Sequence, residues 1–115
     1  MTQIQASATF PAIAPEHSSE FRRLAAQLLD SARSEPGTLQ YDWFFNADGT
    51  RCVVRETYQD SDAVLSHLVA AGAHLARLVE FGGGLHLDVF GEPSIALREA
   101  LAAFSPAIYA HTQGK

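Results

Sequence analysis

The chain has 115 residues and a mass of 12.4 kDa, which is the size of one domain with a sizeable hydrophobic core. Apolar residues make up 47% and charged residues 18%, a balance that excludes a disordered chain and is typical of a globular one. The net charge is -5 and Lys115 is the only lysine. The chain therefore lacks the basic stripe with which proteins bind nucleic acid or an anionic membrane surface.

Cysteine content and the N-terminus predict the compartment. Cys52 is the single cysteine, so no intrachain disulfide can form, as expected in a reducing environment. Its place in an alternating strand favours a packing role over a nucleophile. The N-terminus lacks a basic start and a long apolar run, and no apolar stretch is expected to reach membrane-spanning length. We therefore expect a cytoplasmic protein.

The first third of the chain predicts a strand and a helix. Apolar and polar residues alternate over 4–10, which is typical of a strand. From Glu16 the apolar residues follow helical spacing, with Phe21, Leu24 and Leu28 on one stripe. The segment 35–37, Glu-Pro-Gly, ends this helix because proline disfavours helical geometry in the residue before it.

A hairpin follows. Residues 38–46 and 51–58 read as two strands joined by Asn46-Ala47-Asp48-Gly49, a turn sequence with glycine where a left-handed residue is often needed. The first strand is aromatic on both faces: Phe44 points one way, and the row of Leu39, Tyr41, Trp43 and Phe45 points the other.

The second half predicts two helices around a strand. A helix capped by Asp60 or Ser61 is interrupted by Gly72 and resumes to Phe81. Residues 85–89 alternate as a strand, a last helix covers about 94–103, and 107–109 form a short final strand. The order is β-α-β-β-α-β with an extra C-terminal helix. This order predicts an α+β, ferredoxin-like fold in which helices cover one face of a four-stranded antiparallel sheet.

The open face of that sheet needs a cover. It must carry either Phe44 or the aromatic row, and an exposed aromatic patch usually marks an interface. Two-fold dimers dominate soluble oligomers, so we expect a homodimer that buries the sheet face of each copy. The whole chain, residues 1–115, is expected to be one domain.

The segment 35–68 resembles the antibiotic biosynthesis monooxygenase family. The resemblance rests on Glu35-Pro36-Gly37, Tyr41, Glu56-Thr57-Tyr58, the acidic turn Asp60-Ser61-Asp62-Ala63, His67 and the later His74-Leu75. It covers about residues 2–90 and implies a dimeric α+β barrel. Family members include cofactor-free quinol and polyketide oxygenases, haem-degrading enzymes and proteins without a known reaction. This chain departs from the pattern at Tyr58, where tryptophan is frequent, and in its extension over residues 94–115.

The resemblance implies a site with aromatic walls and a base. A cofactor-free oxygenase needs a base that deprotonates a phenolic or enolic substrate, and the substrate anion then reduces oxygen without flavin or metal. The walls are expected from substrate-binding residues on the hairpin, namely Tyr41, Trp43, Phe45 and Tyr58. The candidates for base or anion holder are histidines, because histidine titrates near neutral pH; these catalytic candidates are His67, His74 and His86.

Each candidate also has a structural interpretation. His67 could simply form a hydrogen bond at the edge of its helix and have no role in a pocket. His74 follows the Gly72 break and could line a pocket or, as in some relatives, bind haem. His86 and Asp88 share a strand face. They could be a base with its orienting carboxylate, or a pair at the dimer rim. Glu56, if it points under the helices, is a buried carboxylate that serves as a substrate-binding pocket acid or as a structural group that hydrogen-bonds to the backbone.

No metal site is expected. His67 and His74 lie on one helix face but about 10 Å apart, too far to share a zinc ion unaided. The leading hypothesis is a cofactor-independent monooxygenase that oxidises an aromatic or quinol-like molecule with O2. The alternatives are a non-catalytic dimeric barrel that binds a small hydrophobic metabolite, and a haem-binding or haem-degrading protein.

Overall fold

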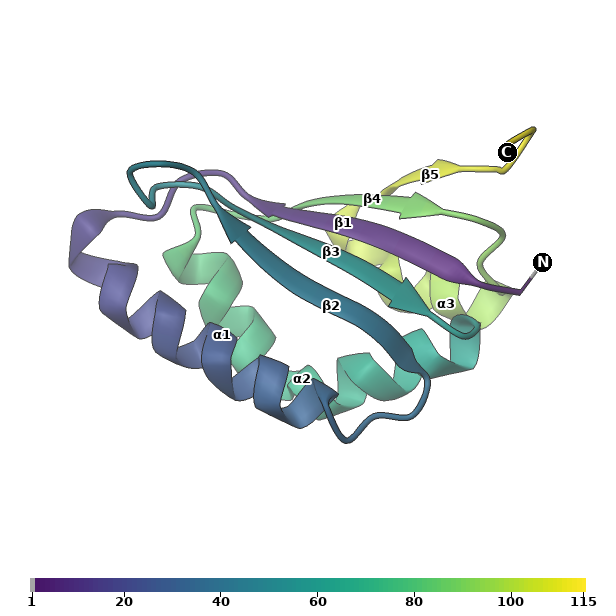
Figure 1. Ribbon diagram of the computed structural model, residues 1–115, viewed down its shortest axis with the longest axis horizontal. Coiled ribbons are helices and arrows are strands. Elements are labelled where there is room, and N and C mark those ends of the chain that lie inside the picture. The colour runs from purple at the N-terminus through teal and green to yellow at the C-terminus, as the bar shows by residue number, and fades with distance from the viewer. Residues whose placement is uncertain (1) are drawn as a thin grey trace.

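The computed structural model describes residues 2–115, and its elements follow the predicted order (Figure 1). The strands are β1 (Ile4–Phe10), β2 (Thr38–Phe45), β3 (Cys52–Tyr58), β4 (His86–Phe90) and β5 (Ala107–Tyr109). The helices are η1 (Pro15–His17), α1 (Ser18–Ala32), α2 (Ser61–Phe81), α3 (Ile95–Leu101) and η2 (Ala102–Phe104). The α+β, ferredoxin-like prediction is confirmed.

The sheet has one strand more than the predicted four. Its order is β2-β3-β1-β4-β5, and β5 lies parallel to β4, so the five-stranded sheet is mixed. The antiparallel pairs β1–β3, β1–β4 and β2–β3 are those of the split βαβ arrangement. The added strand follows from the C-terminal helix, which returns the chain to the β4 edge.

The helices cover one face of the sheet, and the strand register decides which residues lie under them (Figure 1). Trp43 pairs with Val54 and Phe45 with Cys52. Cys52 and Val54 are buried under the helices, so the aromatic residues paired with them face the same way. The aromatic row therefore packs against the core, except Leu39, which sits at a register irregularity and is 54% exposed.

The open face is more polar than expected. Across β1 it presents Gln5, Ser7 and Thr9, and it is apolar at a few residues only. Those residues come from several strands: Phe44, Val53, Phe90 and Tyr109. Phe44 is 56% exposed, and Phe90 and Tyr109 stack with their ring centroids 5.4 Å apart.

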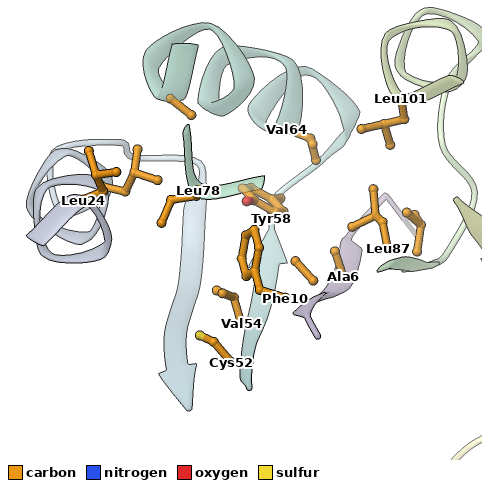
Figure 2. Packing of buried hydrophobic residues seen from close by; sticks show 14 of the residues in the cluster. Ala6, Phe10, Leu24, Cys52, Val54, Tyr58, Val64, Leu78, Leu87 and Leu101 are labelled. Atoms are coloured by element: carbon orange, nitrogen blue, oxygen red, sulfur yellow. The ribbon is translucent and has the colours of Figure 1, made fainter. Parts of the chain in front are cut away.

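The core fills the space between the sheet and the helices. Figure 2 shows Tyr58, Phe10 and Val54 of the sheet beneath Val64 of α2, with Leu87 and Leu101 beside them. On the inner face of β1 the small side chains of Ala6 and Ala8 lie between the larger Ile4 and Phe10. The small residues leave room over the middle of the sheet.

Helix α2 is broken where the sequence places glycine. Its N-cap is Asp60, whose carboxylate accepts a hydrogen bond from the Ala63 amide at 2.8 Å. Gly72 adopts φ 45° and ψ -128°, which no helix contains and which residues with a Cβ avoid. The helix thus bends over the sheet and keeps both halves in contact with the core.

Within residues 2–115, α2 is long and apolar enough to cross a membrane by length and composition alone, with a hydropathy of 1.2. The expectation that no apolar stretch reaches that length is therefore wrong. The helix is interrupted at Gly72, and it buries His67, Ala71 and Leu78 within its own domain. These are the features of a helix in a globular core.

Candidate functional site

A cavity lies between the middle of the sheet and α2. Its volume is about 60 Å³ for the centres of water-sized molecules, several times the space that one water needs. The small side chains of Ala6 and Ala8 form part of its floor. The remaining walls come from all three main helices and from the strands, and the polar residues among them are Tyr41, Trp43, Glu56, Tyr58 and His67.

His67 is fixed in this cavity by a carboxylate from the end of α1. Its Nδ1 lies 2.8 Å from Oε1 of Glu35, and only 7% of the histidine side chain is exposed. The same Glu35 oxygen accepts a hydrogen bond from Oγ1 of Thr38 at 2.8 Å. A carboxylate can only accept, so Nδ1 is the donor of this hydrogen bond, and in the neutral imidazole the lone pair is then on Nε2.

Aromatic rings hold the imidazole on two sides. The ring of Tyr41 meets it edge to face with centroids 4.8 Å apart, and the ring of Tyr58 lies at 5.5 Å. Burial raises the pKa of Tyr41 and of Tyr58, and the neighbouring Glu56 raises both further. The phenols are therefore neutral hydrogen-bond donors at any physiological pH.

Glu56 is a second carboxyl group at the same cavity. Its Oε1 accepts a hydrogen bond from the Tyr58 hydroxyl. Burial raises the pKa of Glu56, while the hydrogen bond from Tyr58 and the nearby His67 oppose that rise. Among the residues that line the cavity there is no lysine or arginine. Glu56 thus lines the cavity, and its hydrogen-bond partner is the side chain of a buried tyrosine, where the structural interpretation had expected the backbone.

Trp43 contributes the largest aromatic wall. Its ring stacks parallel to Phe10 at 6.4 Å and meets Tyr41 edge to face at 5.5 Å. The indole Nε1 is buried and has no hydrogen-bond partner in the described part of the chain. Phe45 lies on the same face, but it packs on Phe21 and under the Arg22 guanidinium, outside the cavity wall.

The other two histidines lie elsewhere. His74 is exposed on α2, with Nε2 2.8 Å from Oε1 of Gln27 on α1. His86 is 67% exposed on the open sheet face, where Nε2 lies 3.2 Å from Oδ1 of Asp88. Of the three candidates, the structure therefore brings His67 alone to the cavity, together with Tyr41, Trp43, Glu56 and Tyr58.

Cys52 is a packing residue, as its strand position indicated. Its side chain is buried in the sheet, and burial raises the pKa of its thiol to about 12, with Arg22 opposing the rise. Within residues 2–115 no three side chains of histidine, cysteine, aspartate or glutamate cluster as metal ligands would.

Sequence analysis missed Glu35 and Thr38 as site residues. The sequence pattern singled out Glu35 only together with Pro36-Gly37, as the end of the helix and as part of the family motif. Its partner His67 is 32 residues further along the chain, and no spacing rule links a helix end to a position inside the next helix.

A profile of the antibiotic biosynthesis monooxygenase family matches residues 5–77, which carry most of the cavity wall. The chain belongs to the antibiotic biosynthesis monooxygenase family. A search of proteins with curated functions found no match.

Solved structures share the monooxygenase family fold of this chain. MupZ from Pseudomonas fluorescens is 29% identical, with a TM-score of 0.79 over 100% of this chain and 94% of that one. Rv0793 from Mycobacterium tuberculosis is 23% identical, with a TM-score of 0.71 over 83% and 99%. A candidate antibiotic biosynthesis monooxygenase from Caulobacter crescentus is 23% identical, with a TM-score of 0.65 over 81% and 92%. MupZ is thus similar along the whole chain, C-terminal segment included.

Proposed function

We propose that this member of the family is a cofactor-independent monooxygenase that oxidises an aromatic or quinol-like small molecule with O2. The observation that carries the proposal is the buried His67, held by Glu35 at 2.8 Å in an aromatic cavity. A general-acid-base histidine needs an orienting partner on one nitrogen and a free second nitrogen beside the substrate.

The reaction begins with the substrate hydroxyl. Nε2 of His67 takes its proton, and the resulting imidazolium is stabilised by the carboxylate of Glu35 at Nδ1. The substrate anion is then the reductant of O2. The carbon of the anion forms a bond to one atom of O2 and gives a hydroperoxide once it is protonated. Loss of water then breaks the O–O bond and the C–H bond at that carbon, so one oxygen atom is retained as a carbonyl and the substrate supplies all the electrons. Tyr41, Trp43 and Tyr58 enclose the ring and keep bulk water from the anion.

We also propose a homodimer through the open sheet face. Phe44 and the stacked pair of Phe90 and Tyr109 support it, because they are exposed large hydrophobic residues on that face. Burial of an aromatic side chain removes about 150–250 Å² from water at about 25 cal/mol per Å². A cytoplasmic location belongs to the same proposal, since the buried free thiol of Cys52 needs no oxidising compartment.

Oxygen consumption with a panel of quinols and anthrones tests the function, with His67→Gln as the matched variant and His86→Gln as the control. Turnover in the parent, a loss of about 100-fold or more in His67→Gln, and no change in His86→Gln support it. Ligand-induced thermal shifts without any oxygen uptake would instead favour a binding protein. A Soret shift on addition of haemin would favour haem binding.

A further inference from the structure

The cavity contains a second polar group that the proton transfer to His67 does not use. Glu56 lies across the strand pair from Tyr41 and next to Ala6 of β1, at the centre of the cavity floor. It is partly buried although it faces the helices, so its remaining accessible surface opens into the cavity. A carboxyl group in that position contacts any ligand that fills the cavity.

Its neighbours define which oxygen is free. The Tyr58 hydroxyl donates to Oε1, and no hydrogen bond from the described residues reaches Oε2. Tyr58 has 0% exposure, so it is a fixed support for the carboxyl group. Oε2 is the atom with which Glu56 meets a ligand.

Burial in the apolar cavity favours the neutral acid, while the hydrogen bond from Tyr58 and the nearby His67 oppose it. The titratable groups that face Glu56 are Tyr41 on β2, Tyr58 on β3, His67 on α2 and Glu35 behind it. None is lysine or arginine. A protonated carboxyl group in an apolar site is a strong hydrogen-bond donor toward an oxygen that gains negative charge.

We propose that Glu56, positioned by Tyr58, donates a hydrogen bond from Oε2 to the carbonyl oxygen of a ligand, and that with His67 it catalyses enolisation of a ketone without O2. The inference rests on the proposed function in one respect only: both use His67 as the base. What it adds is an activity on carbon acids and a role for Glu56 as the hydrogen-bond donor to the oxyanion.

The step balances without any redox partner. The bond between the α-carbon and its hydrogen breaks, and the proton moves to Nε2 of His67. The electron pair forms the carbon–carbon double bond of the enolate, whose oxygen carries the negative charge and accepts the hydrogen bond from Glu56. Return of a solvent-exchanged deuteron from His67 to the same carbon completes an exchange of hydrogen for deuterium. The burial that raises the pKa of Glu56 is consistent with a donor that stays protonated through this cycle.

The test is deuterium exchange at the α-carbon of 2-tetralone in D2O under strictly anaerobic conditions, followed by proton NMR. We expect the parent to accelerate exchange above buffer that contains the same concentration of imidazole. Glu56→Met removes the hydrogen-bond donor at a similar side-chain length and is expected to slow the enzymatic rate about 100-fold. Tyr109→Phe, which removes a tyrosine hydroxyl outside the cavity, is the matched control and is expected to exchange at the parent rate.

The pH profile separates a positioning role of Tyr58 from a merely structural one. The rate falls at high pH as Glu56 ionises, and this limb is absent in Glu56→Gln. The Tyr58 hydroxyl lowers the pKa of Glu56, so Tyr58→Phe moves the limb to higher pH while slowing exchange. No exchange by the parent, or rates in Glu56→Met within threefold of the parent, overturns the inference.

A measurement on the unmodified protein decides the case if the variants do not fold. 2-Naphthol has the shape of the enol of 2-tetralone. When bound, it is expected to absorb as the naphtholate at a pH where free 2-naphthol is neutral. Absorption as neutral naphthol in the bound state contradicts the proposal. Deuterium exchange without oxygen uptake on quinols would support this inference and reject the monooxygenase. Oxygen uptake without deuterium exchange would support the monooxygenase and reject this inference.

Discussion

Oε1 of Glu35 lies 2.8 Å from Nδ1 of His67, and the same oxygen accepts from Oγ1 of Thr38 at 2.8 Å. One carboxylate oxygen thus ties the end of α1 and the start of β2 to the middle of α2. The contact gives the cavity an imidazole whose orientation and protonated nitrogen are both set by the fold. The chemistry proposed for His67 depends on this contact.

We predict that Glu35→Gln reduces kcat at least tenfold and changes KM little. The amide oxygen still accepts from Nδ1, but the negative charge that stabilises the imidazolium is gone. Steady-state oxygen uptake measures both constants. Thr38→Val, which leaves the charge in place, is the milder comparison, and equal losses in both variants would show that orientation matters and charge does not.

The free energy of unfolding should fall as pH rises because of Glu56. Its pKa in the folded protein is raised by burial above the ordinary value of 4.5. The stabilisation from a protonated Glu56 is therefore complete below about pH 4.5 and is lost as pH rises through the folded pKa. Each unit of pKa elevation corresponds to about 1.4 kcal/mol.

Urea unfolding of the parent and of Glu56→Gln across this pH range measures the effect. The difference in stability between Glu56→Gln and the parent should increase with pH, because the amide does not ionise. A difference that is independent of pH would mean that Glu56 titrates normally in the folded protein.

Gly72→Ala should destabilise the fold by about 1–3 kcal/mol, since alanine does not tolerate φ 45° with ψ -128°. A Cβ at this position has open space around it, so the cost comes from the backbone alone. Thermal unfolding measures it, with Ser66→Ala at an exposed position of the same helix as the control. Higher stability in Gly72→Ala would mean that α2 straightens without loss of packing.

Phe44→Arg should convert the proposed dimer into a monomer. Phe44 is 56% exposed on the open sheet face, and a guanidinium buried there without a partner opposes association. Size-exclusion chromatography with light scattering at micromolar concentration gives the mass. Val69→Arg, at an 82% exposed position on α2, should keep the dimer mass. A parent that already runs at 12.4 kDa would reject the dimer.

Local sequence patterns predicted the elements of the fold, because each depends on neighbouring residues. The alternation of apolar and polar residues predicted β1. Pro36-Gly37 predicted the end of α1, and Gly72 predicted the break in α2. The parallel position of β5 was not predictable in the same way. It depends on how α3 and η2 return the chain to the edge of β4.

The sequence by itself determined that this chain has aromatic residues on both faces of one strand, a histidine inside the second long helix and an α+β order of elements. Only the tertiary structure decided that Tyr41 and Trp43 lie under the helices with His67, and that His74 and His86 lie outside the cavity. It also decided that Glu35 reaches His67 across 32 residues. The physical reason is that side-chain direction follows from local periodicity, whereas a shared cavity and a buried hydrogen bond follow from strand register and helix packing over long sequence separations.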